Sequence, residues 1–287
     1  MASPGTQLAP QPPPSPSPAP PPAGPAAIPP KAAHGTTGRG EVTIVSLILV
    51  AVIGWAGAFA ATTTNMWFIV LGAFLVFILF LGRWICGRPL GIFVAQRNLM
   101  SLSRFQMVLW TVLILSAYFT MCVHRMRDGA PDALLIGMDW HLWALMGIST
   151  TSMVGSPLLL GSKMQKDPHQ DEIAKAAAQL NDQKVDDNRV GMLYANPTIN
   201  DASFADMFQG DEVGNTYYVD VAKLQMFFFT WVSLVVYGAA IFNLLKRGVY
   251  SAMPGVSEGL LALLGISHAG YLTSKVTDHT QAAAPAS

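Results

Sequence analysis

Six apolar runs, separated by polar segments, determine the pattern of the chain. A membrane-spanning helix needs about 20 mostly apolar residues, because each residue rises about 1.5 Å through a hydrocarbon core about 30 Å thick. Five runs meet this length or nearly so. The sixth is short and contains His268, so the sequence leaves open whether residues 257–273 span the membrane or are re-entrant. The runs lie at 42–61, 66–82, 105–123, 140–161, 224–245 and 257–273.

The polar segments between the runs complete the predicted organisation. The first 30 residues contain 13 prolines among alanine, glycine and serine, a composition typical of a disordered segment. We therefore predict a disordered tail at 1–41, a transmembrane hairpin at 42–83, a basic connector at 84–104, a first hairpin repeat at 105–161, an acidic loop at 162–221, a second hairpin repeat at 222–275 and a C-terminal tail at 276–287.

Composition agrees with an all-α, polytopic membrane protein of about six transmembrane helices. Hydrophobic residues make up 52% of the 287 residues and charged residues only 12%, about half of what a soluble surface normally carries. The net charge of zero and the absence of a basic, aromatic-rich stretch argue against nucleic-acid binding. Two cysteines, Cys86 and Cys122, exclude a disulfide scaffold. No histidine or cysteine spacing indicates a metal site, and no cofactor is expected.

The distribution of lysine and arginine predicts the orientation. The connector and its flanks carry Arg83, Arg88, Arg97 and Arg104 without an acidic residue among them, and cationic flanks stay on the cytoplasmic side. With six spans, both termini and the acidic loop share that side, which gives 13 Lys/Arg inside against four outside. We expect a multi-pass protein of the bacterial inner membrane in contact with lipid.

The connector also shows helical periodicity. Ile92, Ala95, Leu99 and Leu102 recur at intervals of three and four residues, with polar side chains on the other face. This pattern predicts either an amphipathic helix lying on the membrane surface or an extension of the next spanning helix.

Two helical hairpins have matching sequences. In each, a Gln-Met pair is followed by a threonine and, seven residues later, a tyrosine, and the partner helix carries Gly-Ile-Ser and ends in Ser-Lys. A tandem duplication explains this shared order, and both copies start on the same side, as parallel repeats do. The matched residues are Gln106, Met107, Thr111, Tyr118, Gly147, Ser149 and Lys163 in the first copy, and Gln225, Met226, Thr230, Tyr237, Gly265, Ser267 and Lys275 in the second.

Small and polar residues within the repeats predict helix packing. Small side chains at intervals of four let helices approach closely in lipid. The two glutamines are expected to exchange amide hydrogen bonds across the pseudo-twofold axis, and Arg104 and Lys223 to extend to the lipid head groups. The predicted packing residues are Gln106, Gln225, Gly147, Thr151, Gly155, Gly265 and Ala269. The same small-residue stripes can alternatively line a polar path.

The acidic loop predicts a surface for protein docking. It has a net charge of six negative, and residues 170–180 read as a short alanine-rich helix with Ile173, Ala177 and Leu180 on one side. Further along, aromatic residues alternate with acidic ones, a composition found at protein interfaces. The predicted partner-binding residues are Phe204, Asp206, Phe208, Asp211, Glu212, Tyr217 and Tyr218.

His268 lies within an apolar run, where an ionisable group is costly and therefore suggests a function. It can form a proton or ion path with Asp139 and His141, or remain a neutral imidazole bonded to a neighbouring helix. Ser267 and His268 lie in a seven-residue stretch, 265–271, that resembles the serine motif of rhomboid-type intramembrane proteases. The second catalytic helix of that family is missing here.

Over residues 90–275, the Gln-Met and Gly-Ile-Ser elements and Asp206-Met-Phe-Gln-Gly-Asp-Glu212 resemble a group of bacterial multi-pass membrane proteins of unassigned activity. The chain is also similar to the membrane partner of phage-tail-like contractile injection systems. That similarity implies a cytoplasmic tail and a membrane domain that engage the injection particle.

These observations predict a non-enzymatic anchor that recruits a cytoplasmic protein assembly to the membrane. The alternative is a channel or transporter formed by the tandem hairpins, and an intramembrane serine hydrolase is third. The sequence leaves a homo-oligomer open.

Overall fold

The fold of this chain is mostly helical. A computed structural model describes residues 36–60, 62–182 and 184–282, and within these ranges only isolated β-bridges, and no strands, accompany the helices. The predicted disordered tail at 1–41 lies largely outside the described residues. Its last part is helical, because the first helix begins at Thr36 rather than after residue 41.

Five helices are long and apolar enough to cross a membrane, which makes the fold compatible with a multi-pass membrane protein. The sixth apolar run forms a shorter helix, α8, with Glu258 in its first turn and Lys275 in its last. It is not among the five. The five are α1 (Thr36–Phe59), α2 (Thr63–Cys86), α3 (Leu102–Arg127), α4 (Trp140–Leu160) and α7 (Val221–Lys246), and α8 spans Glu258–Val276.

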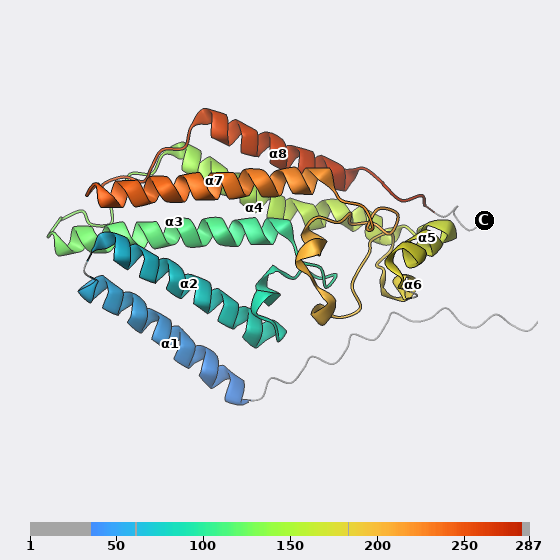
Figure 1. Cartoon of the computed structure of the whole chain (residues 1–287), viewed down its shortest axis with the longest axis horizontal. Coiled ribbons are helices and arrows are strands. Elements are labelled where there is room, and N and C mark those ends of the chain that lie inside the picture. The colour runs from blue at the N-terminus through green and yellow to red at the C-terminus, as the bar shows by residue number, and fades with distance from the viewer. Residues whose placement is uncertain (1–35, 61, 183, 283–287) are drawn as a thin grey trace, which may run out of the picture.

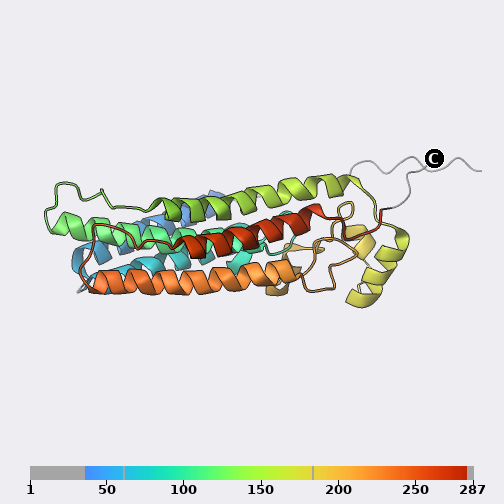
Figure 2. The same cartoon turned by 90° about the horizontal axis from the view of Figure 1, so that it is seen from above.

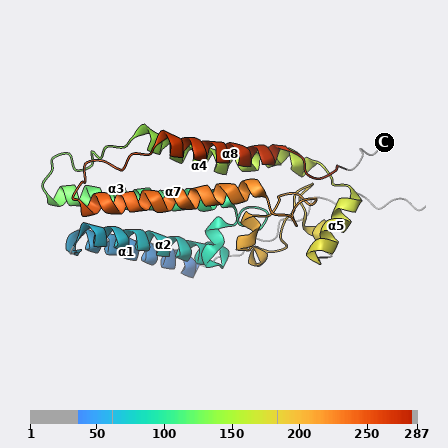
Figure 3. The same ribbon diagram turned by 45° about the horizontal axis from the view of Figure 1, so that its top comes forward.

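The six helices pack as three layers of two helices each, antiparallel in one layer (α1 and α2) and parallel in the other two (Figures 1 and 3). α1 pairs with α2, α4 pairs with α8, and α3 lies beside α7 between these two pairs. α1, α3 and α7 all start at the same end of the bundle, and α2, α4 and α8 return to it (Figure 1). The two hairpins α3–α4 and α7–α8 therefore run in the same direction, as parallel repeats would.

Local sequence explains where the helices begin. Asp139, Asp220 and Ser257 precede α4, α7 and α8, and each side chain accepts a hydrogen bond from a backbone N–H of the first turn. Such caps satisfy N–H groups that have no partner within the helix. At the far end of the bundle, Trp140 and Trp143 are 62% and 59% exposed, as expected of tryptophans at a membrane surface.

Aromatic and aliphatic side chains fill the bundle between α2, α3 and α7. The Trp110 and Tyr237 rings meet edge to face, with centroids 5.9 Å apart. Trp67 Nε1 donates to Ser116 Oγ at 3.1 Å, and Tyr237 Oη donates to the Pro254 carbonyl at 3.1 Å. The polar atoms of the buried Trp67 and Tyr237 side chains are thus satisfied, as a stable core requires.

A small folded unit, the headpiece, covers the end of the bundle where α1 begins and α8 ends (Figure 2). We define it as residues 87–101, 161–220 and 277–282. The predicted short helix is confirmed: α5 spans Gln170–Leu180 and buries Ile173. The remaining short elements are α6 (Val185–Asn188) and the 3₁₀ turns η1 (Pro89–Phe93), η2 (Gly161–Gln165), η3 (Ile199–Asp201) and η4 (Phe204–Met207).

The connector differs from both predicted forms. After η1 the chain folds into a tight hairpin in which Val94 pairs with Met100, and Asn98 takes a left-handed conformation at φ 56°. The apolar periodicity reflects burial rather than a helix, because Leu99 and Met100 pack into two apolar clusters of the headpiece. Arg88 likewise donates to the carbonyls of Ile199 and Ala202, within the headpiece.

A close backbone contact fixes this hairpin to α2. A Cβ atom added at Gly82 would lie 2.3 Å from the Pro89 carbonyl oxygen, whereas one added at Gly72 on the same helix would meet nothing within 4 Å. We expect Gly82→Ala to destabilise the protein by about 1–3 kcal/mol through overpacking. Gly72→Ala should be neutral or slightly stabilising, because alanine favours helix. Thermal unfolding in detergent micelles compares the two, and equal melting temperatures would contradict this contact.

Candidate functional site

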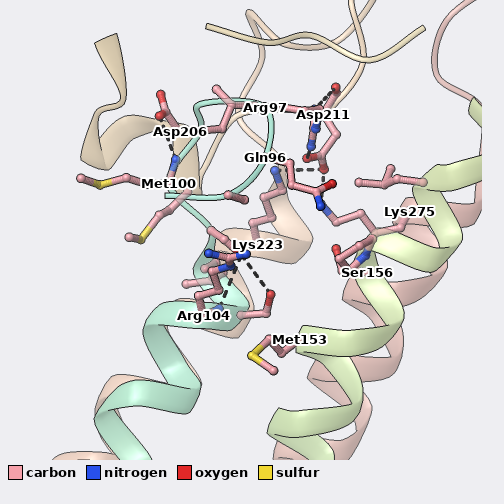
Figure 4. Close-up of a pocket in the computed structure, with 18 of the residues that line it drawn as sticks. Gln96, Arg97, Met100, Arg104, Met153, Ser156, Asp206, Asp211, Lys223 and Lys275 are labelled. Atoms are coloured by element: carbon pink, nitrogen blue, oxygen red, sulfur yellow. Dashed lines mark hydrogen bonds and ion pairs between the residues drawn. The ribbon is translucent and has the colours of Figure 1, made fainter. Parts of the chain in front are cut away.

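Three basic side chains converge on one carboxylate between the headpiece and the bundle (Figure 4). Asp211 Oδ1 lies 2.6 Å from Arg97 Nη2, and its Oδ2 lies 3.1 Å from Lys223 Nζ. Lys275 Nζ also donates to Oδ2. Arg97 further donates to the carbonyls of Tyr194 and Asp211, at 2.8 and 2.9 Å. One aspartate therefore joins two segments of the headpiece, around residues 97 and 211, to α7 and α8.

A second buried ion pair lies beside the first. Lys163 Nζ lies 2.6 Å from Glu212 Oε1, and the Lys163 side chain is only 1% exposed. The lysine also donates to the Thr277 carbonyl, while Glu212 Oε2 accepts from the His279 N–H at 2.9 Å. Asp211 and Glu212 thus bind Lys275 and Lys163 respectively, the lysines that end the two Ser-Lys motifs.

The lysines of the Asp211 cluster are buried, so their pairing matters for stability. The Lys223 and Lys275 side chains are 5% and 4% exposed, so their charges are largely removed from water. A buried charge is tolerated only when it is paired and hydrogen-bonded. Burial raises the pKa of the Asp211 carboxyl, but the charges of Lys223, Lys275 and Arg97 outweigh this and hold its pKa well below the usual value.

A pocket of about 390 Å³ adjoins the Asp211 cluster. Its polar side includes Arg104, which donates to the Val94 carbonyl at 2.8 Å, together with Arg97, Lys223 and Lys275. Its other wall is mostly apolar and is formed by residues of α3 and α4, among them Met107, Val108, Met153, Pro157 and Leu160. The pocket is therefore amphiphilic, with cations at the headpiece and apolar groups along the helices.

Three of the predicted partner-binding residues face inward. Asp206, at 7% exposure, accepts from the N–H groups of Met100 and Ser203. Asp211 and Glu212 are held by the ion pairs above. These three carboxylates are structural acceptors and are not available to a docking partner, because each already has donors within the chain.

The predicted aromatic residues are differently placed. Phe204 and Tyr218 are 46% and 64% exposed, and Phe208 and Tyr217 are partly buried. Phe204 also contacts the rings of Phe105, Phe208 and Phe227, so it lies where the headpiece meets α3 and α7.

Only some of the predicted helix-packing residues contact a neighbouring helix. Gln106 donates to Thr230 Oγ1 and to the Met226 carbonyl, whereas Gln225 is exposed, so the predicted exchange between the two glutamines is wrong. Arg104 and Lys223 bind the headpiece rather than extending to lipid.

The small-residue stripes are also offset from the α4–α8 contact. Gly147, Thr151 and Ala269 are exposed, and only Gly155 and Gly265 would bring a Cβ near the partner helix, at 3.7 Å from Leu272 and 3.9 Å from Ile148. The buried side of α4 instead carries the serines 149, 152 and 156. α4 therefore packs through the face that carries these serines and not through the predicted stripe of small residues.

His268 is not connected to Asp139 and His141. Its Nδ1 lies 2.6 Å from Ser152 Oγ, in the buried interior between α4 and α8. Ser152 lies thirteen residues along α4 from Asp139, roughly 20 Å at the helical rise. Asp139 and His141 instead bond each other at the start of α4. The three residues therefore do not form one path, and His268 matches the alternative of an imidazole bonded to a neighbouring helix.

Sequence reasoning missed the cluster because its members were interpreted separately. Lys163, Lys223 and Lys275 all stand at helix ends beside the acidic loop, and Asp211-Glu212 is an adjacent acidic pair in that loop. The match between three lysines at helix ends and an adjacent acidic pair in the loop between the helices was the signal in the sequence that could have revealed the cluster. Among the described residues no group of three or more histidines, cysteines or carboxylates could hold a metal ion.

No protein-family model matches the chain, and neither a curated protein nor a solved structure is similar to it. The fold and the composition define the class as a helical protein with five candidate membrane-spanning helices.

Proposed function

We propose that this protein is a non-enzymatic membrane anchor whose headpiece docks a cytoplasmic protein assembly at the inner membrane. The observation that carries the proposal is that the segment between the two hairpins belongs to a folded headpiece, fixed to the start of α7 and the end of α8 by buried ion pairs. A rigid platform on a set of membrane helices suits recruitment, because little conformational entropy is lost when a partner binds.

The direction of the helices supports a shared docking side. α1, which begins at Thr36, starts on the side of the bundle that carries the headpiece, and α8 ends on that side (Figure 1). A proline-rich segment extends by at most about 3 Å per residue, which lets it reach a partner before the headpiece engages. The positive-inside distribution assigns this side to the cytoplasm.

Exposed aromatic groups on the headpiece supply the docking surface. The segment around Phe208 pairs with the segment around Val219, since Gly210 N–H donates to the Tyr218 carbonyl and Asp220 N–H donates to the Phe208 carbonyl. This pairing places Phe208 beside the segment of Tyr218 and Val219, and the Phe204 ring contacts the Phe208 ring. Tyr218 and Val219 are 64% and 63% exposed.

The headpiece also carries exposed acidic side chains. The exposed carboxylates of the headpiece include Asp167, Asp171, Asp186, Asp187 and Asp201. An aromatic patch with a charged periphery is the usual anatomy of a protein interface, and the acidic charge favours a partner with a basic surface. The resemblance to the membrane partner of contractile injection systems makes such a particle the first assembly to test.

The test compares crosslinking in native membranes between the wild type and the double variant Phe204→Ser/Tyr218→Ser. We expect the double variant to lose at least tenfold of the crosslinked assembly, because aromatic anchors contribute most of the energy of an interface. Trp143→Ser is the matched control, since Trp143 is equally exposed but lies at the far end of the bundle. Undiminished crosslinking by the double variant, with the assembly identified by mass spectrometry, would refute this docking surface.

A further inference from the structure

The amphiphilic pocket carries more positive than negative charge. Its lining contains four cations, Arg97, Arg104, Lys223 and Lys275, against the two carboxylates of Asp206 and Asp211. Asp206 is already engaged by N–H and hydroxyl donors of its own headpiece segment. The nearest further carboxylate, Asp220, caps α7 by accepting from the N–H groups of Ala222 and Lys223.

The positive charge of the pocket that the two carboxylates do not balance lies where it destabilises the protein when no anion is bound. Lys223 lies in the first turn of α7, where the helix dipole also repels a cation. Lys223 and Lys275 are almost fully buried and share one aspartate oxygen. Like charges held together away from water are stabilised by an added anion.

The shape of the pocket restricts the kind of anion. Met153 and Leu160 lie seven residues apart on α4, so the apolar wall extends roughly 10 Å along the helix, away from the headpiece. α3 and α4 are both long and apolar enough to span a membrane, so lipid chains around these helices would lie beside this wall. A volume of about 390 Å³ is within the range of small-ligand pockets.

We propose that this pocket binds a phosphate monoester group beside Arg104, Lys223 and Lys275. Arginine and lysine are the usual phosphate ligands in proteins, and the arginine can bind two phosphate oxygens at once. The apolar wall of α3 and α4 favours a phosphate carried by a lipid, whose glycerol and first methylene groups contact Met107 and Met153. Free inorganic phosphate presents the same kind of oxygens to these three basic side chains.

Binding of dioctanoyl phosphatidic acid to the purified full chain in neutral maltoside micelles tests the proposal, with inorganic phosphate and dioctanoyl phosphatidylcholine as parallel probes. We expect saturable binding of phosphatidic acid, at least tenfold weaker binding of phosphatidylcholine, and at least a tenfold loss in Arg104→Gln. Arg83→Gln is the matched control, because Arg83 also donates to a backbone carbonyl but does not line the pocket.

A second pair of variants distinguishes the two phosphate sources. Met153→Trp fills the apolar wall, whereas Val154→Trp changes an exposed neighbour outside the pocket. If the phosphate is carried by a lipid, Met153→Trp alone weakens phosphatidic acid at least tenfold. If inorganic phosphate binds as tightly and neither tryptophan matters, the same phosphate site serves a soluble ligand. Failure of both phosphates to bind, equal binding of phosphatidylcholine, or equal affinities of Arg104→Gln and Arg83→Gln would overturn the proposal.

Discussion

Asp211→Asn is expected to loosen the headpiece from the helical bundle and to lower the free energy of unfolding by about 3–5 kcal/mol. This is the usual loss when one partner of a buried ion pair is removed. The substitution keeps the size of the side chain but leaves Arg97, Lys223 and Lys275 without their shared anion. Limited proteolysis in the headpiece and thermal unfolding in micelles should both report the loss.

Asp186→Asn is the control for this prediction. Asp186 also pairs with an arginine, Arg189, but its side chain is 52% exposed, and exposed pairs contribute roughly 0–1 kcal/mol. If Asp211→Asn were no more sensitive to protease than Asp186→Asn, the central role of the cluster would be wrong.

The pH dependence of the same contact has a definite sign. The pKa of Asp211 is lowered in the folded protein, so its stabilising contribution is fully present above the unfolded value of about 3.9. That contribution is lost only as the pH falls through the lower folded value. The difference in stability between wild type and Asp211→Asn should therefore persist at pH 4 and shrink only under stronger acid.

The sequence predicted the helices well because their signals are local. Apolar runs have a fixed relation to membrane thickness, and α5 was predicted at its observed bounds because its periodicity and its composition agree. About six transmembrane helices were predicted, with the final run marginal, and α8 is not among the five candidate spans. These features depend on residues within one turn or one span of each other.

The site was much harder to predict because its contacts are distant in sequence. Arg97 and Asp211 are 114 residues apart, and Lys275 is 64 residues beyond Asp211. An acidic residue in a polar loop is usually solvated, so Asp211 and Glu212 were interpreted as surface groups. The connector shows the same difficulty: the spacing of Leu99 and Leu102 fits one helix, but Leu99 is buried in the hairpin and Leu102 begins α3.

These corrections change which part of the headpiece can meet a partner. The acidic pair at 211–212 binds the helix ends and so determines how the headpiece sits, while Phe204 and Tyr218 remain accessible. Structural and recognition roles are therefore carried by neighbouring but different residues. Variants of the ion pairs should impair docking indirectly through instability, whereas Tyr218→Ser, at a ring that is 64% exposed, should impair docking at unchanged stability.

Lys163 and Glu212 form the most isolated buried pair of the headpiece, which makes them suitable for a double-mutant cycle. Both side chains are at most 2% exposed. Lys163→Met leaves the carboxylate of Glu212 buried with only a backbone N–H donor, and Glu212→Gln leaves the ammonium of Lys163 with a backbone carbonyl and the more distant Asp278. We expect each single variant to lose about 3–5 kcal/mol of unfolding free energy.

The double variant Lys163→Met/Glu212→Gln should be less damaging than the sum of the two single variants, because removing both charges leaves no unpaired ion to bury. Chemical unfolding in micelles, with tryptophan fluorescence as the probe, measures all four members of the cycle. A coupling free energy of at least about 2 kcal/mol is expected for a pair this close and this dry. Strict additivity would show that Lys163 and Glu212 act independently rather than as a pair.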